Sequence, residues 1–185
     1  MDNNMKLQDI IDSKLLNERK VFLWGQVDDK SAKQVIERIL YLDLIDPGKE
    51  IQLIINSPGG HVTSGFAIYD AMTGVSSPVS TVCTGLAASM GSILLSAGKK
   101  GRRFVLPHAR VMIHQPSGGT GGAASDIEIQ MEEILKIKKQ GAEILAKNCG
   151  KSVDKILKDF NRDYWMSAEE SIKYGIVDGQ MDKLV

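Results

Sequence analysis

Residues 51–60 read IQLIINSPGG, an apolar run that ends in a Pro-Gly-Gly turn. The near-continuous apolar character of residues 51–55 is typical of a strand with both faces covered, as in a parallel sheet. The following Asn-Ser-Pro-Gly-Gly, residues 56–60, is a strong turn signal. We therefore expect a buried strand that ends at the carboxyl edge of a sheet, where α/β proteins bind their ligands.

Short apolar runs alternate with segments of helical periodicity on both sides of this strand. The runs predict four further strands, at residues 21–24, 79–84, 103–106 and 111–114. The periodic segments predict helices at residues 32–40, 64–72, 88–97 and 126–148, and a short helix that begins at Ser167. Ser125 with Glu128, and Ser167 with Glu170, have the spacing of capping boxes. The alternation predicts an α/β fold that forms a single domain over residues 1–185.

The composition excludes several classes of protein. A chain of 185 residues with 43% hydrophobic side chains can bury a core without a disulfide or a structural metal. Equal numbers of basic and acidic side chains, 23 of each, argue against nucleic acid as the main partner. The longest weakly polar run, residues 85–98, is shorter than the roughly 20 residues that a membrane-spanning helix needs. One basic cluster fits a solvated turn or a subunit contact: Lys99, Lys100, Arg102 and Arg103.

The cysteine content and the first residues of the chain bear on its compartment. Cys83 and Cys149 lie far apart and, with only three histidines in the chain, do not predict a zinc site. The apolar neighbours of Cys83 indicate a small buried residue and not a reactive thiol. The N-terminal residues lack the cationic and apolar regions of a signal peptide. We therefore expect a cytoplasmic protein that binds no metal and does not enter a membrane.

A serine stands at the junction between a predicted strand and a predicted helix. The segment from Gly85 to Gly91 surrounds Ser89 with small residues, which let the backbone turn tightly. The N–H groups at the start of the helix would face an oxyanion that develops at this point. The pattern is close to the G-x-S-x-G nucleophile elbow, with Ala87 in place of the first glycine. Ser89 is therefore either a nucleophile or only a helix cap.

Three histidines compete for the role of general base. His61 follows the Pro-Gly-Gly turn and His108 follows Pro107, and both fit surface residues. His114 closes an apolar strand at the carboxyl end, where sheet enzymes place their catalytic groups. We favour His114, with a hydrogen-bonded core histidine as the alternative.

The third member of a triad would be a carboxylate that holds the imidazole in the productive tautomer. Asp163 lies in a charged segment beside bulky aromatic residues. Position alone does not select it from 23 acidic residues, and a surface salt bridge with Arg162 is the simpler interpretation of these two residues.

Taken together, these segments are similar to those of the ClpP family, the proteolytic subunits of Clp proteases. The resemblance spans residues 7–185 and rests on four motifs in order, at residues 55–60, 87–91, 112–116 and 162–163. It implies a ClpP/crotonase-like fold of β-β-α superhelical units with a protruding handle helix. The handle region would cover about residues 115–150.

The resemblance also implies roles for five residues. Ser89 would be the nucleophile, His114 the general base and acid, and Asp163 the group that orients the histidine. The backbone N–H groups of Gly60 and Met90 would form the oxyanion hole. Glycine suits this role because it lets an amide approach the intermediate without an intervening side chain.

The implied activity is that of a serine endopeptidase that degrades unfolded polypeptides through an acyl-enzyme. The implied partners are further copies of the chain in two stacked seven-membered rings, or a paralogous subunit in mixed rings, and a hexameric AAA+ ATPase. ATP is used by that ATPase, so we expect no cofactor in this chain.

Several positions depart from the family's usual pattern. Asn161 stands where an acidic residue that pairs across the rings is usual, and Ala123 replaces a glutamine of the handle loop. Gln52 and Ile54 stand where aromatic residues of the docking pocket are common, and the N-terminal stretch is shorter than the family's axial loop. These departures support a second hypothesis, a catalytically quiet scaffold subunit of a mixed ring. A third, an acyl-CoA enzyme of the crotonase type, does not need the predicted histidine and aspartate.

Overall fold

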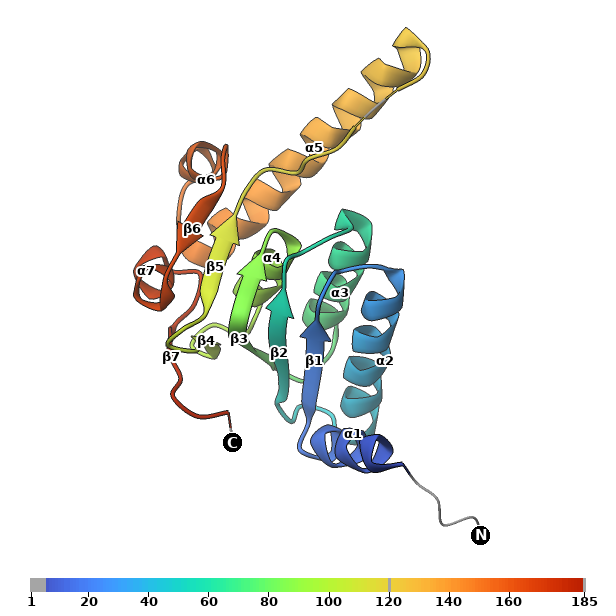
Figure 1. The fold of residues 1–185 in the computed structure, drawn as a ribbon, viewed down its shortest axis with the longest axis vertical. Helices are drawn as coiled ribbons and strands as arrows, with labels where there is room; N and C mark the ends of the chain where they lie inside the picture. The colour runs from blue at the N-terminus through green and yellow to red at the C-terminus, as the bar shows by residue number, and fades with distance from the viewer. Residues whose placement is uncertain (1–5, 120, 185) are drawn as a thin grey trace.

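Strand β2 (Ile51–Ser57) forms the centre of the structure, a computed structural model that describes residues 6–119 and 121–184. It is parallel to β1 (Lys20–Trp24) on one side and to β3 (Val79–Ala88) on the other (Figure 1). Leu53 and Ile55 are fully buried, because strands flank β2 and helices cover the sheet. The buried parallel strand that the sequence predicts is thereby confirmed.

Strand β3 changes its partner at Gly85, and this change shapes the edge of the sheet. Its first half pairs with β4 (Arg103–Val105) and its second half pairs with β5 (Arg110–Ile113), both in parallel. Gly85 has a φ of +74°, and a Cβ there would lie 2.8 Å from Oδ1 of Asn56. Only glycine fits this kink, and Asn56 Oδ1 accepts a hydrogen bond from the N–H of Leu86 next to it.

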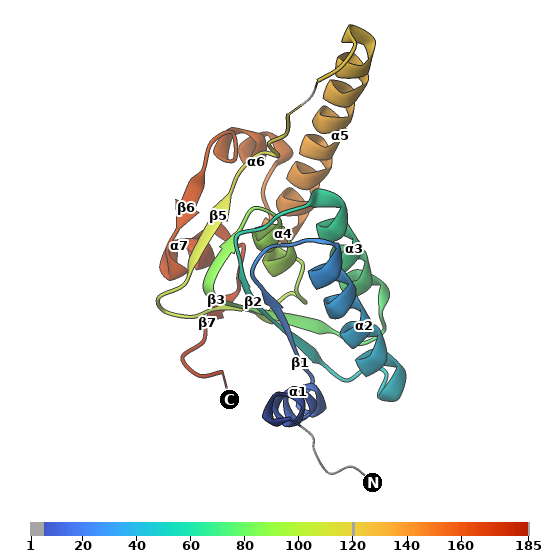
Figure 2. The same ribbon diagram turned by 45° about the vertical axis from the view of Figure 1, so that its right-hand side comes forward.

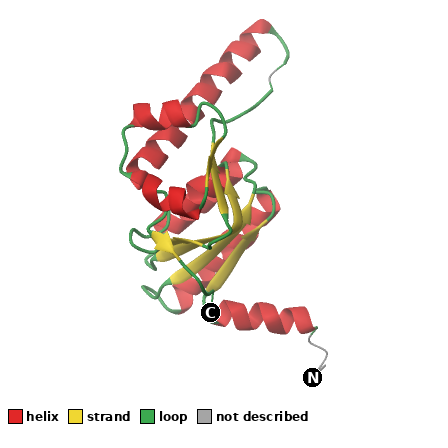
Figure 3. Cartoon of the chain, turned by 60° about the vertical axis from the view of Figure 1, so that its left-hand side comes forward, coloured by secondary structure: helices red, strands yellow, loops and turns green. Residues whose placement is uncertain are grey.

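Two short strands complete the sheet. β6 (Tyr164–Met166) is antiparallel to β5, and β7 (Gly179–Gln180) is parallel to β4. The sheet is therefore mixed, with an antiparallel edge beside a parallel centre. Figure 3 shows its strands in yellow among the red helices.

Helices cover one face of the parallel strands and flank the antiparallel edge. The helices on the covered face are α2 (Asp29–Ile45), α3 (Val62–Gly74) and α4 (Met90–Ser96) (Figure 2). The remaining shorter helices are α1 (Leu7–Asn17), which lies below the start of β1, and α6 (Val153–Asp159) and α7 (Ala168–Tyr174) near β5 and β6. Among residues 6–119 and 121–184, no helix is both long and apolar enough to span a membrane.

Helix α5 (Ala124–Cys149) projects from the body of the molecule (Figure 1). Its buried residues all lie at the base, between Gly141 and Cys149, while the outer turns are exposed. The described residues between β5 and α5 run alongside the helix. This arrangement confirms the protruding handle, and with it the α/β fold class that the sequence predicts.

The predicted elements all occur, with differences at their ends. β3 continues to Ala88, and for this reason α4 begins at Met90 and not at residue 88. The sequence pattern does not predict α1, α6, β6 or β7, which are short or carry few core residues. Cys83 and Cys149 are buried, as expected for Cys83, and burial raises the pKa of their thiols to about 12 and about 11.

One of the two predicted capping boxes is confirmed and the other is wrong. Ser167 caps α7: its Oγ accepts a hydrogen bond from the N–H of Glu170, whose side chain accepts one from the N–H of Ser167. Helix α5 instead begins one residue before Ser125, with Ala123 as its uncapped N-cap residue. Alanine is the best helix former, so the helix extends past Ser125 and leaves that side chain inside the first turn.

This contrast predicts unequal effects of two matched substitutions. Ser167→Ala removes a cap and should lower the free energy of unfolding by about 1 kcal/mol. Ser125→Ala removes no cap and should change it by less than about 0.5 kcal/mol. Urea unfolding followed by circular dichroism measures both. Equal losses in the two variants would contradict the assignment of the caps.

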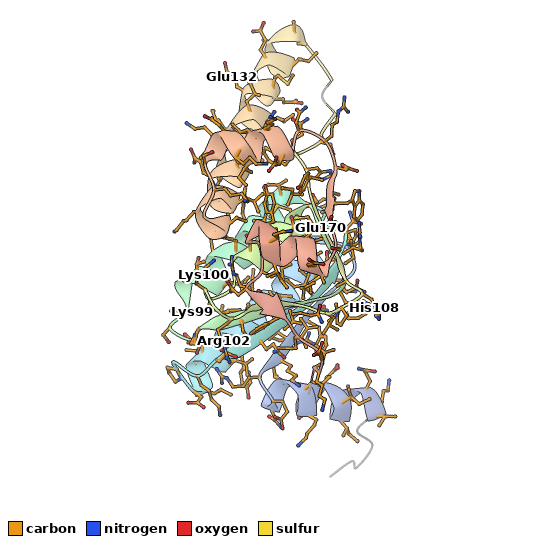
Figure 4. All side chains as sticks on the ribbon, turned by 90° about the vertical axis from the view of Figure 1, so that its left-hand side faces the viewer. Lys99, Lys100, Arg102, His108, Glu132 and Glu170 are labelled. Atoms are coloured by element: carbon orange, nitrogen blue, oxygen red, sulfur yellow. The ribbon has the colours of Figure 1, made fainter. Side chains whose placement is uncertain are left out.

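The basic cluster that the sequence suggested is divided between the surface and the core. Lys99, Lys100 and Arg102 lie on the surface (Figure 4), and Arg102 forms an ion pair with Glu50. Arg103 is buried, and its guanidinium pairs with Asp178 at 2.6 Å. Burial alone would raise the pKa of the Asp178 carboxyl, but the hydrogen bonds and charge of Arg103 lower it to about 2.

Arg103 also connects three distant segments. Its Nη1 donates to the backbone carbonyls of Ser96, at the end of α4, and Asn148, near the end of α5. The ion pair with Asp178 adds the C-terminal segment to the same network. The expectation of a solvated turn is thus wrong for Arg103, whose charge is satisfied inside the protein.

Candidate active site

Ser89 lies between β3 and α4 with an unusual backbone conformation. Its φ is +55° and its ψ is −124°, values that a residue other than glycine seldom adopts. Hydrogen bonds on both sides hold it there: its N–H donates to the carbonyl of Met112, and its own carbonyl accepts from the Ser92 hydroxyl and N–H. A strained, well-supported residue of this kind is typical of active sites. The tight turn that the G-x-S-x-G-like pattern predicts is confirmed.

The Pro-Gly-Gly turn after β2 lies directly against this junction. A Cβ on Gly59 would lie 2.6 Å from Cβ of Ser89 and 2.9 Å from N of Met90, so only glycine permits the approach. The neighbouring Gly60 is equally restricted, because a Cβ there would lie 2.1 Å from the carbonyl oxygen of Val27. The two glycines therefore bring a bare backbone next to the serine.

The hydrogen bonds around Gly60 determine which way its N–H points. The N–H of Val27 donates to the carbonyl of Gly59, and the N–H of His61 donates to the carbonyl of Val27, each at 2.8 Å. Because the residues on both sides of Gly60 are the ones that bond to Val27, the N–H of Gly60 itself points away from Val27. The N–H of Met90 is the first in α4 and has no acceptor within the helix. Met90 follows Ser89 directly in the chain, and Gly59, the neighbour of Gly60, lies against Ser89.

His114 and Asp163 meet through the pairing of β5 with β6. In this antiparallel pair Ile113 stands opposite Tyr164, which places the next residues along, His114 and Asp163, opposite each other. Nδ1 of His114 lies 3.0 Å from Oδ1 of Asp163. The Asp163 carboxylate therefore accepts a hydrogen bond from the His114 imidazole. The alternative prediction, a salt bridge between Asp163 and Arg162, is not observed among the described residues.

A second contact fastens the segment that carries Asp163. The N–H of Gln115 donates to the carbonyl of Phe160, and the side-chain Nε2 of Gln115 donates to the carbonyl of Asn161 at 2.8 Å. Gln115 follows His114 directly, so this contact holds the loop before β6 against the end of β5. It fixes the separation between the histidine and the aspartate.

Ser89 and His114 line one cleft. The rest of its wall is apolar and comes from α3, α4, α5, the end of α6 and the segment after β5, with Phe66, Ile93, Ile137 and Phe160 among its residues. In residues 6–119 and 121–184 no hydrogen bond joins Ser89 to His114. Contacts of this kind often tighten only when substrate is bound.

The other sequence candidates lie elsewhere. His61 is exposed at the start of α3, and His108 is exposed on the surface (Figure 4). The sequence predicts Ser89, His114 and Asp163 as site residues but none of the apolar residues of the cleft. The helical spacing of apolar residues in 137–141 and 62–66 predicts a buried helix face. It does not predict that this face lines a cleft.

No group of three or more His, Cys, Asp or Glu side chains in the described ranges is arranged to hold a metal ion. Within the part of the chain that the structure describes, the candidate site thus consists of a hydroxyl, an imidazole, a carboxylate, two backbone amides and an apolar cleft. This arrangement can carry out acyl transfer by nucleophilic catalysis.

Comparison with known proteins places these features in a family. The sequence model of the Clp protease family matches residues 2–183. The chain is 51% identical over 171 residues to the ATP-dependent Clp protease proteolytic subunit of Porphyromonas gingivalis, which covers 92% of this chain and 77% of that protein. It is 54% identical over 166 residues to proteins of the same name from two strains of Bacteroides fragilis, covering 90% of this chain and 80% or 76% of theirs.

Proposed function

The chain belongs to the Clp protease family, a family of peptidases, and on this premise we propose that it is a serine endopeptidase subunit of an ATP-dependent Clp protease. Its catalytic residues are Ser89, His114 and Asp163, with an oxyanion hole formed by the N–H groups of Gly60 and Met90. The observation that carries the proposal is the 3.0 Å contact between His114 and Asp163 beside the cleft that His114 shares with Ser89.

Acylation begins when Oγ of Ser89 attacks the scissile carbonyl and its proton passes to Nε2 of His114. The resulting oxyanion accepts hydrogen bonds from the N–H groups of Gly60 and Met90, a contribution worth about 100- to 1000-fold per donor. Asp163 keeps the other imidazole proton on Nδ1 and stabilises the imidazolium. His114 then donates its Nε2 proton to the leaving amine, which departs and leaves an ester on Ser89.

Deacylation repeats these steps with water. The water oxygen attacks the ester carbonyl while Nε2 of His114 removes a proton from the water. The oxyanion forms again in the same oxyanion hole. Collapse of this intermediate returns the proton to Oγ of Ser89 and releases a carboxylic acid.

The proposal extends to assembly and partners. We infer self-assembly into two stacked seven-membered rings, with or without a paralogous subunit, that receive unfolded polypeptides from a hexameric AAA+ ATPase. The exposed apolar residues of the outer turns of α5, among them Ile129 and Leu135, support a contact between copies at the handle. The chain acts as one domain in the cytoplasm and uses no cofactor of its own, since the ATPase consumes the ATP.

A fluorophosphonate probe tests the proposal directly. We expect the purified protein to be labelled on Ser89, as mapped by mass spectrometry, because the probe reacts with serines that a base activates. His114→Ala should lower the labelling rate by about 100-fold or more. The matched variant His108→Ala replaces an exposed histidine and should react as the unmodified protein does. A folded protein that stays unlabelled would instead support the scaffold subunit of a mixed ring.

A further inference from the structure

The loop that carries Asp163 is held at both ends by one residue of α7. Residues 160–163 connect α6 to β6, so that Asp159 precedes the loop and Tyr164 follows it. The hydroxyl of Tyr174, the last residue of α7, donates to Oδ2 of Asp159 at 2.8 Å. The ring of Tyr174 also packs against the ring of Tyr164, with centroids 5.5 Å apart. A single side chain thus contacts the residues on either side of the loop.

Both partners of this hydrogen bond are buried and in the protonation state that the bond needs. Tyr174 is buried, and the side chain of Asp159 is only 8% exposed. Burial and the hydrogen bond to Asp159 raise the pKa of Tyr174, so its hydroxyl keeps the proton that it donates. Burial alone would raise the pKa of Asp159, but hydrogen bonds from Lys155 and Tyr174 lower it, so the carboxylate stays charged. Water therefore competes little for this contact.

The position of the Asp163 carboxylate depends on the backbone of this loop. Among the described residues, the Asp163 side chain has no hydrogen bond other than the one to His114, and it is largely exposed. No second partner among them would bring the carboxylate back if the loop moved. The strand after the loop, β6, has only three residues, so its pairing with β5 gives limited support. The contacts of Gln115 inside the loop and of Tyr174 at its two ends supply further support.

We propose that Tyr174 is a positioning residue for catalysis, whose two contacts hold the loop 160–163 in the bend that presents Asp163 to His114. Tyr174 does not line the cleft, and α7 carries no other residue of the candidate site. Its effect on the reaction therefore passes through the loop and the carboxylate of Asp163. Displacement of a catalytic group by about 1 Å can lower a rate by about 100-fold. This inference rests on the proposed function.

Two substitutions of Tyr174 measure this effect. Tyr174→Leu removes both contacts and should lower kcat for a fluorogenic peptide by about 10- to 100-fold, with little change in KM. Tyr174→Phe keeps the ring contact and loses only the hydrogen bond, so kcat should fall by about 3- to 10-fold. Lys151→Met is the matched control. It removes the ammonium that lies 4.5 Å from the centre of the Tyr174 ring, leaves both contacts with the loop in place and should keep full activity.

The same substitutions in an Asp163→Ala protein separate positioning from a general loss of structure. Asp163→Ala leaves no carboxylate to position, so Tyr174→Leu should lower the residual kcat of that protein by less than about twofold. A purely structural role of Tyr174 predicts the same factor in both backgrounds. Equal factors would therefore overturn the inference. A Tyr174→Leu protein with unchanged kcat, or with a change in KM alone, would overturn it as well.

The Asp163→Ala protein also keeps the inference distinct from the proposed function. A large loss of kcat in Asp163→Ala, together with equal factors for Tyr174→Leu in the two backgrounds, would overturn only the role of Tyr174. Full activity of Asp163→Ala would overturn the catalytic role of Asp163 and this inference with it. If circular dichroism shows that Tyr174→Leu does not fold, Tyr174→Phe decides by the same comparison, because its ring still packs against Tyr164.

Discussion

Ser89→Ala is expected to lower the rate of peptide hydrolysis by at least about 10⁴-fold. The substitution removes the only atom that forms the acyl-enzyme, while the oxyanion donors at Gly60 and Met90 remain in place. Those donors and the cleft account for the small residual rate that should be left. Steady-state hydrolysis of a fluorogenic peptide measures the loss.

The fold should be unaffected, because alanine can occupy the same backbone position and no side-chain hydrogen bond of Ser89 is lost within the described residues. Ser13→Ala, an exposed serine of α1, is the matched control and should keep full activity. Hydrolysis by Ser89→Ala at more than a hundredth of the normal rate would show that another residue is the nucleophile.

Asp163→Asn is expected to lower kcat by about 10³- to 10⁴-fold with little change in KM. An amide at this position can donate to Nδ1 of His114, which moves the imidazole proton to Nε2. The nitrogen that must accept the serine proton is then already protonated. The Asp163 side chain is 60% exposed in the single chain, so water competes for hydrogen bonds to its carboxylate. For the single chain we therefore expect a loss in kcat near 10³-fold.

Two further variants make this result specific. Asp163→Glu retains a carboxylate and should recover part of the activity, which a purely structural role of the side chain would not predict. Asp154→Asn removes an exposed carboxylate from α6 and should have no effect on kcat. A loss in Asp163→Asn that appears in KM alone would contradict the tautomer argument.

The sequence predicts the parallel centre of the fold well because its signals are local. The apolar run at residues 51–55 and the glycine turn after it define β2 without reference to the rest of the chain. Ser89 is found for the same reason, since small residues between a strand and a helix are visible in one window. The kink at Gly85 determines where β3 changes its pairing partner, but the local sequence pattern does not predict this kink.

The parts of the site that the sequence leaves open depend on contacts between distant segments. His114 and Asp163 are 49 positions apart, and they meet only because β6, a strand of three residues, pairs with β5 in one register. The residue pattern alone does not distinguish Asp163 from the other acidic residues, whereas the family resemblance does. The cleft has the same origin, because the periodicity of α5 does not reveal that Gly141 faces α4.

The backbone conformation of Ser89 serves activity but lowers the folding stability of the protein. Conformations like its φ of +55° cost on the order of 1–3 kcal/mol in any residue with a Cβ, a large share of the stability of an ordinary domain. Glycine would adopt the same turn without that cost. Selection for thermal stability alone would therefore favour glycine at this position, and such a protein would have no nucleophile for peptide hydrolysis. The serine persists only where hydrolysis itself is selected, so a thermostabilised variant of this protein should be assayed for activity before its melting temperature is counted as a gain.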